Sequence, residues 1–231
     1  QILIYNVKFA HSHSKYLGRM ADILTEAGHN VTSLIPIIDE ELEDGPKSSP
    51  VIRLGPDADA KAVNDFQQQL MTHIFSASMF NPLGSVFMSK FFGALFALQC
   101  EAVLDEPGLI DRLKNEKYDV MIAEHFDMCG VALSHLIKPK TLISTSSSFV
   151  FSQHYEEFGI PQITSFMPAS LISHLNVHSM FDRLKNIVAA WLERLQFYYF
   201  RVDSRGIVTQ FPSRPIAYLA GYFIKRILHF R

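Results

Sequence analysis

The sequence predicts an α/β fold in which a Rossmann-like parallel sheet is flanked by helices. Short apolar runs typical of buried strands alternate along the chain with helical patterns, the order that builds a parallel sheet. The stretch Ile2–Pro36 contains a strand, a helix and a second strand, and so compact a unit implies a right-handed parallel crossover. With 48% hydrophobic and 19% charged residues, the 231-residue chain can build a substantial core.

The opening unit begins with the apolar run Ile2–Val7, which suits a strand covered on both faces. From Ser14 onward the apolar residues follow helical spacing along one face. They are Leu17, Met20, Ala21, Leu24 and Ala27. Gly28 supplies a stop at the helix C-terminus, and Val31–Ile35 is predicted to be the second strand.

The middle of the chain is predicted to be mainly helical. Asp39–Pro50 is acidic and contains Pro and Ser, so we expect a surface loop, and Val51–Leu54 is a candidate third strand. Residues 57–104 are strongly apolar and helical in pattern, with a break at Asn81–Gly84. A turn at Pro107-Gly108 then precedes a short helix that runs through Lys114.

Two further strands and two further helices are predicted after that turn. Tyr118–Ala123 is a clear strand, and an apolar helix follows it to about Ile137. Thr141–Thr145 is the next strand, and residues 146–173 are irregular. The apolar residues from Phe181 to Leu195 fit an amphipathic helix, and the pattern weakens beyond Phe200.

Composition and motifs exclude several classes of function. A net charge of −2 and a pI near 6.6 argue against a nucleic-acid partner, which requires a basic stripe. Glycine-rich phosphate loops of the GxGxxG or GxxxxGK type are missing, which argues against a nucleotide site at the first loop. His11 and His13 alone do not make a metal site, so we predict neither metal nor cofactor. Ile216–Ile224, the best candidate for a membrane anchor, is shorter than the roughly 20 apolar residues a span needs.

Two smaller features lead to further expectations. Cys100 and Cys129 fit neither a zinc pattern nor a CxxC redox pattern, so two buried free thiols are the favoured interpretation. A disulfide between them is the alternative if the chain folds in an oxidising compartment. Asn30-Val31-Thr32 matches a glycosylation sequon, but it opens a strand predicted to be buried, so we expect it to be unused.

Two ionisable groups are predicted to meet at the carboxyl edge of the sheet, where such folds bind ligands. His13 lies in the loop after the first strand, just before the helix, whose positive end disfavours imidazolium. A neutral imidazole suits a general base near pH 7. Glu124 ends its own strand, and its carboxylate could bond the far ring nitrogen and stabilise the cation formed.

Other interpretations of these histidines remain. A loop histidine is more often a surface or capping residue, and His11 is a rival base on the same loop. His29 is expected only to support the end of its helix. His125 and Asp127 could pair with each other or face solvent. The serines within residues 144–148 lie at the end of a predicted strand, but they lack the GxSxG pattern of a nucleophile elbow.

Three segments resemble the amino-terminal half of the UDP-glycosyltransferases, in particular the nematode glucuronosyltransferase-like group. They are HSHSKYLGRMADILTEAGHNVTSLIP, YDVMIAEHFDMCG and GIPQITSFMP, within a match that runs from Ile2 to about Phe200. The resemblance implies a GT-B enzyme whose amino-terminal half, residues 1–200 here, binds the acceptor while the carboxyl-terminal half binds the UDP-sugar. It also implies that His13 is the catalytic base and that Glu124 stands where many members carry a shorter Asp.

The resemblance further implies direct displacement with inversion and an apolar pocket for a small lipophilic acceptor. His11, Phe126, Phe149 and Phe166 are the residues expected to line that pocket. The UDP-sugar is a co-substrate, so no cofactor is expected. By the same resemblance, we expect a detoxifying enzyme in the lumen of the endoplasmic reticulum.

The donor half that carries an HGGxxS-like signature is not found in the sequence, and residues 201–231 form an atypical tail. We therefore expect these residues alone to be inactive in sugar transfer. One alternative is a non-catalytic protein that binds lipophiles or docks on full-length family members. Another is an unrelated α/β enzyme that uses His13 with a different partner.

Overall fold

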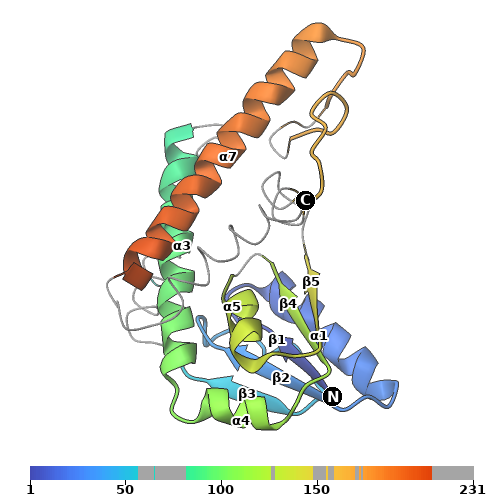
Figure 1. Cartoon of the computed structure of the whole chain (residues 1–231), viewed down its shortest axis with the longest axis vertical. Helices are drawn as coiled ribbons and strands as arrows, with labels where there is room; N and C mark the ends of the chain where they lie inside the picture. The colour runs from blue at the N-terminus through green and yellow to red at the C-terminus, as the bar shows by residue number, and fades with distance from the viewer. Residues whose placement is uncertain are drawn as a thin grey trace. The chain divides into compact units, whose positions relative to one another are not determined.

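The structure is a computed structural model that forms two compact units (Figure 1). It describes residues 1–56, 65, 82–125, 128–147, 155, 159–169, 172 and 174–209. The first unit contains Gln1–Leu70 and Leu95–Ser147, and the second contains Met71–Ala94 and Ser148–Arg231.

The first unit is built on one five-stranded sheet in which every pair of neighbouring strands is parallel. In spatial order the strands are β3 (Val51–Leu54), β2 (Val31–Pro36), β1 (Ile2–Tyr5), β4 (Val120–Glu124) and β5 (Thr141–Thr145). The strand order reverses at β1, which pairs with β2 on one side and with β4 on the other. The predicted Rossmann-like α/β fold is therefore confirmed.

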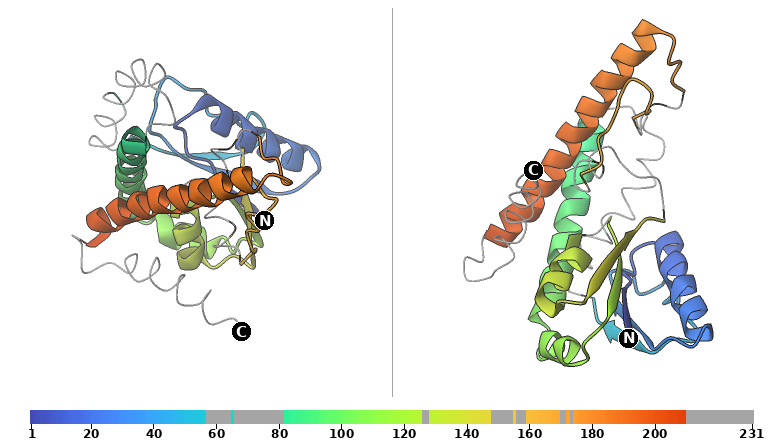
Figure 2. Two further views of the ribbon diagram at one scale, coloured as in Figure 1. Left: turned by 90° about the horizontal axis from the view of Figure 1, so that it is seen from above. Right: turned by 45° about the vertical axis from the view of Figure 1, so that its right-hand side comes forward.

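Helices cover both faces of this sheet, as Figure 2 shows. Helix α1 (His11–Glu26) packs on one face, where its Leu17 is buried together with Ile4 of β1 and Ile122 of β4. Helix α5 (Met128–Ile137) covers the other face, where Gly130 approaches Tyr5 and Ala123 closely. A Cβ at Gly130 would lie 2.7 Å from the Cβ of Ala123, so only glycine allows α5 to lie this close to the sheet.

Helix α1 begins three residues earlier than the sequence predicts. Ala10 is the N-cap residue and is extended, with φ −150° and ψ 141°, and its carbonyl accepts the first helical bond from the Ser14 N–H at 3.1 Å. Ser14, the expected start, is instead buried. His11 and His13 therefore lie in the first helical turn rather than in a preceding loop.

The loop between β2 and β3 is tied to the middle of α1. The Oδ1 atom of buried Asp22 accepts hydrogen bonds from the backbone N–H groups of Lys47 (2.8 Å) and Ser48 (2.7 Å). Burial by itself would raise the pKa of Asp22, but these bonds outweigh it and hold the pKa below its ordinary value. A Cβ at Gly18 would collide with the backbone of Gly45 and Pro46, and a Cβ at Gly45 would collide with the backbone of Ser14, so neither position has room for one.

Cys100 and Cys129 form a disulfide, so the favoured prediction of two free thiols is wrong. Cys100 belongs to α3 (Pro82–Asp105) and Cys129 to the first turn of α5. Motif spacing missed the pair because the contact depends on how the two helices pack, not on the sequence separation of 29 between the cysteines. A bridge of this loop length stabilises a fold by about 3 to 4 kcal/mol in the chain-entropy model.

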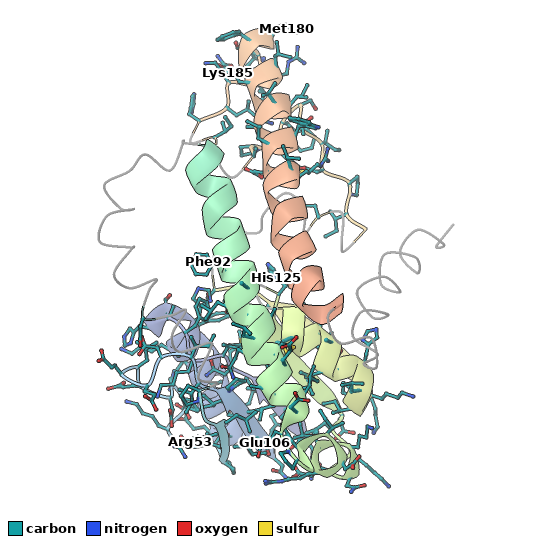
Figure 3. All side chains as sticks on the ribbon, turned by 90° about the vertical axis from the view of Figure 1, so that its left-hand side faces the viewer. Arg53, Phe92, Glu106, His125, Met180 and Lys185 are labelled. Carbon is teal, nitrogen blue, oxygen red and sulfur yellow. A yellow bond between two sulfur atoms is a disulfide. The ribbon has the colours of Figure 1, made fainter. Side chains whose placement is uncertain are left out.

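Helix α4 (Leu109–Asn115) follows α3, close to the predicted bounds. In the second unit, α7 (Met180–Thr209) extends beyond the predicted amphipathic stretch and passes through residue 200. Figure 3 shows Met180 and Lys185 among the side chains of its first turns. Within the described ranges, no helix combines the length and the apolar character needed to cross a bilayer.

Buried Asn186 connects α7 to the irregular segment before it. Its Oδ1 atom accepts a hydrogen bond from the Ala169 N–H at 2.7 Å. Its Nδ2 group donates to the carbonyls of Thr164 (2.7 Å) and Met167 (2.8 Å). These three bonds satisfy backbone groups that have no helix or strand partner, which explains how a segment without regular structure is held in place.

Candidate active site

The candidate site lies at the carboxyl edge of the sheet, where the strand order reverses between β1 and β4. The chain leaves β1 toward α1 on one face and leaves β4 toward α5 on the other, so this is the topological switch point at which open α/β sheets bind ligands. His13 comes from the first turn of α1, and Glu124 is the last residue of β4. The two residues predicted as a catalytic pair thus meet at the same edge of the sheet from separate elements.

The imidazole of His13 bonds directly to the carboxylate of Glu124. His13 Nδ1 lies 2.7 Å from Glu124 Oε2, and the two side chains are only 15% and 8% exposed. An ionised carboxylate can only accept hydrogen bonds, so Nδ1 carries the proton. In the neutral ring, Nε2 then holds the lone pair, which is the arrangement a general base requires.

Ser147, two residues beyond β5, completes the arrangement. Its backbone N–H and its hydroxyl both donate to Glu124 Oε1, at 2.8 and 2.7 Å. Its Oγ atom also lies 2.9 Å from His13 Nδ1. Because the hydroxyl proton points at the carboxylate, the oxygen faces Nδ1 with a lone pair and shares its N–H with Glu124. The longer Glu side chain is therefore anchored at both oxygens.

These contacts keep Glu124 ionised. Burial by itself would raise the pKa of Glu124, but the hydrogen bonds from His13 and Ser147 outweigh it, so the pKa lies below its ordinary value. The carboxylate is thus negative near pH 7 and available to stabilise an imidazolium on His13. That charge offsets the positive end of the α1 dipole, which disfavours the cation.

The geometry is not that of a serine hydrolase. In a Ser-His-acid triad the nucleophile and the acid bond to opposite ring nitrogens. Here Ser147 and Glu124 both contact Nδ1 of His13, and the serine proton is directed at the carboxylate. His13 therefore cannot take the Ser147 proton through Nε2, and Ser147 acts as a positioning residue.

Aromatic side chains bound the site on the side of the first loop. The ring of Phe9 lies 4.5 Å from the imidazole of His13 between centroids, and Phe96 meets Phe9 edge to face at 5.0 Å. Tyr16, one turn after His13, shares a 2.6 Å hydrogen bond with Thr145 at the end of β5. The first two turns of α1 are thereby joined to both β4 and β5.

The other predicted site residues have different outcomes. His11 is exposed at the first residue of α1, while the Glu124 carboxylate bonds to His13, so His13 is the imidazole that Glu124 orients. Phe166 lies in the second unit and is 56% exposed. Phe126 and Phe149 fall outside the described residues. As residues that contact the acceptor, His11 and the three phenylalanines stay predictions.

His125 is buried rather than facing solvent, at 7% exposure, and its backbone N–H donates to the Thr145 carbonyl at 3.1 Å. Burial lowers the pKa of its imidazole, and the charge of Glu124 only partly opposes this. Its suggested partner Asp127 lies outside the described residues. Among the residues that the structure describes, no group of three or more His, Cys, Asp or Glu side chains could hold a metal ion.

The sequence alone did not identify Ser147, Phe9 or Phe96 as residues of the site. The serines at 144–148 were recognised as a strand exit, but only the pairing of β5 with β4 brings Ser147 to Glu124. Phe9 lies between the first strand and His13 in the sequence, so its position could have suggested an aromatic side chain beside the base. Phe96 gave no signal of its own within an apolar helix.

Replacing Ser147 with Ala is expected to raise the pKa of Glu124, because the hydroxyl hydrogen bond to the charged carboxylate is lost while the backbone N–H remains. Titration of the Glu124 carboxyl carbon by NMR measures the shift. Ser144→Ala is the matched control on the same segment, because the Ser144 hydroxyl has no partner among the described residues. An equal shift in both variants would contradict the proposed role.

The same substitution has a defined effect on stability. The folded pKa of Glu124 lies below its unfolded value, so its contribution is present above about pH 4.3 and is lost as the pH falls through the folded pKa. Ser147→Ala should therefore lower the free energy of unfolding more at pH 7 than at pH 3, as denaturant titration can show.

Most of the chain is similar in sequence to known glycosyltransferases. The family model of UDP-glucuronosyl and UDP-glucosyl transferases matches residues 1–221. Human UDP-glucuronosyltransferase 3A1 is 31% identical over 225 residues, covering 89% of this chain and 39% of that protein. The putative UDP-glucuronosyltransferase ugt-48 of Caenorhabditis elegans is 26% identical over 215 residues, covering 90% of this chain and 39% of that protein.

The chain thus spans about two-fifths of the length of these curated relatives. No solved structure matches it. The family model covers nearly all of the sequence, including β1, α1, β4 and the residues that form the His13–Glu124 pair. This chain belongs to the UDP-glucuronosyl and UDP-glucosyl transferase family.

Proposed function

We propose that this chain is the acceptor-binding side of a glycosyltransferase that moves a sugar from a UDP-sugar to a small lipophilic acceptor with inversion. Within it, residues 1–200 are the acceptor-binding domain of a GT-B enzyme. The observation that carries the proposal is the 2.7 Å contact between His13 Nδ1 and Glu124 Oε2 at the carboxyl edge of the sheet. This contact gives the edge of the sheet a base whose protonated form is stabilised by a carboxylate. The loop after the first strand lacks the glycine-rich pattern that binds phosphates.

The proposed step is a single displacement. Nε2 of His13 takes the proton from an acceptor hydroxyl while the hydroxyl oxygen forms a bond to the anomeric carbon of the sugar. The bond between that carbon and the UDP oxygen breaks, and UDP leaves with the electron pair. Attack opposite to the leaving group inverts the anomeric centre. Glu124 stabilises the imidazolium, a contribution worth about 10²–10⁴-fold in comparable acid–base pairs.

The surroundings support a lipophilic acceptor handled in an oxidising compartment. Phe9 and Phe96 place an apolar surface beside the base, which suits an acceptor with little charge. The Cys100–Cys129 disulfide fits the lumen of the endoplasmic reticulum, because disulfides persist in oxidising compartments. A role in detoxification would follow from such an acceptor class.

The direct test uses a fusion protein, the joined enzyme, in which residues 1–231 are followed by the part of human UDP-glucuronosyltransferase 3A1 that this chain does not match. Its turnover is measured with UDP-glucuronate and with UDP-glucose as donors. Glu124→Gln is expected to lower turnover about 10²–10⁴-fold, because the amide carries no charge to stabilise the imidazolium. Glu124→Asp retains the charge and should lose less. Equal activity of wild type and Glu124→Gln would contradict the proposal. The 231 residues alone are expected to show no turnover.

A second candidate function is lipophile binding without catalysis, or docking on a full-length family member. It is favoured by an open groove of about 400 Å³ in the second unit. The groove is lined by Ile172, Phe181, Leu184, Lys185, Val188, Ala189 and Leu192. Saturable binding of a fluorescent lipophile that is lost in Leu184→Asp but unchanged in Glu124→Gln, with no turnover by the joined protein, would select this candidate.

A further inference from the structure

We propose that Asn30 carries an N-linked glycan. Asn30-Val31-Thr32 is the one Asn-x-Ser/Thr sequence in the chain, and its middle residue is not proline. The sequence favoured an unused site because Asn30 opens a strand that was expected to be buried. In the structure Asn30 is exposed, and burial begins one residue later, at Val31.

The local backbone presents Asn30 at the surface. Helix α1 ends at Glu26, and Gly28 turns the chain away with φ +88°, a conformation that suits glycine. The carbonyl of Asn30 then accepts a hydrogen bond from the Ile2 N–H at 2.8 Å. This bond fixes the backbone at the entrance to β2. Among the described residues, no hydrogen bond involves the Asn30 side chain, so a substituent on Nδ2 breaks none of them.

The disulfide provides independent evidence for the compartment that glycosylation requires. Cys100 and Cys129 are paired, and such bonds form and persist in the lumen of the secretory pathway rather than in a reducing cytosol. N-linked glycans are added to Asn-x-Ser/Thr in secreted and lumenal chains. The sequon and the disulfide are separate observations, and both point to the lumen of the secretory pathway.

A glycan at Asn30 is compatible with the candidate active site. His13 lies in the first turn of α1, at the carboxyl edge of the sheet, whereas Asn30 lies just beyond the other end of the same helix. The 16 residues of α1 extend roughly 24 Å. The glycan would therefore project from the amino edge of the sheet and leave the His13–Glu124 pair accessible.

The chemical step needs an activated oligosaccharide linked through pyrophosphate to a lipid carrier. The Nδ2 atom of Asn30 forms a bond to the anomeric carbon of that oligosaccharide. The bond between this carbon and the pyrophosphate oxygen breaks, and the lipid pyrophosphate leaves with the electron pair. One amide proton passes to the base of the transferring enzyme. Nothing is oxidised or reduced.

The test uses the full 231-residue chain, expressed with a secretory signal sequence in eukaryotic cells, and analyses only the fraction that is protected from external protease. Digestion with peptide-N-glycosidase F is expected to lower the apparent mass by one discrete step. Digestion in ¹⁸O-water should convert residue 30 to a labelled Asp, which peptide mass spectrometry identifies. A protected wild-type chain with no mass shift and no label at residue 30 would overturn the proposal.

Three variants locate the modification. Asn30→Gln and Thr32→Ala each remove the sequon and should abolish the shift, whereas Thr32→Ser keeps the sequon and should retain it. A shift that persists in Asn30→Gln would also overturn the assignment. These readouts do not depend on turnover, so the outcome is separate from that of the proposed function. In the joined enzyme, Asn30→Gln is expected to leave transfer unchanged.

Discussion

Replacing His13 with Ala is expected to lower sugar transfer by about 10²–10⁴-fold, because the variant lacks the imidazole whose Nε2 takes the proton of the acceptor hydroxyl. The expectation rests on the Nδ1 contacts to Glu124 and Ser147, which leave Nε2 as the basic nitrogen of the neutral ring. Turnover of UDP-glucuronate by the joined enzyme measures the loss. It should appear mainly in kcat, with little change in the affinity for the acceptor.

Two other histidines of the same helix region provide the controls. His29 is exposed beyond the far end of α1, so His29→Ala should retain wild-type turnover. His11 is the rival base, exposed in the same helical turn as His13. If His11→Ala abolished transfer while His13→Ala retained it, the assignment of the base would be wrong.

Replacing Gly18 with Ala is expected to destabilise the fold by about 2 kcal/mol. A Cβ at Gly18 would lie 2.2 Å from the carbonyl carbon of Gly45 and 2.5 Å from the nitrogen of Pro46, both backbone atoms that cannot rotate away. Overpacking of this kind costs about 1 to 3 kcal/mol or more. The better helix propensity of Ala returns at most about 1 kcal/mol. Urea denaturation of the 231-residue chain measures the difference.

Gly55→Ala is the matched control, because nothing lies within 4 Å of its Cβ position and its φ is not positive. Its free energy of unfolding should change by less than about 0.5 kcal/mol. A stable Gly18→Ala protein would show that the loop after β2 can move away from α1. The joined enzyme should then still lose turnover if the loop positions His13, since Gly18 lies little more than one turn after it.

The candidate base and its carboxylate partner could be predicted because each stands at a recognisable strand end. Parallel strands bring their carboxyl ends to one edge, so His13 and Glu124 were expected in one crevice although 111 residues separate them. The start of α1 was wrong by three residues. The apolar spacing placed its first residue at Ser14, but the extended Ala10 is the N-cap residue, so the helix begins at His11.

The residues that complete the site depended on packing that the sequence does not reveal. Ser147 reaches Glu124 because β5 pairs with β4. Cys100 meets Cys129 because α3 and α5 lie side by side on one face of the sheet, which spacing rules for metal or redox motifs do not test. Asn30 is exposed because the turn at Gly28 ends before the strand becomes buried.

By itself the sequence determined the alternation of strands and helices, the near-neutral charge and the chemical types available at each strand end. These properties are local, because they follow from the periodicity and identity of neighbouring residues. Only the tertiary structure decided that Nδ1 of His13 is the nitrogen bound by Glu124, that Ser147 anchors the same carboxylate and that two cysteines are paired. Those contacts join residues far apart in the chain, so they exist only once strand order and helix packing are established.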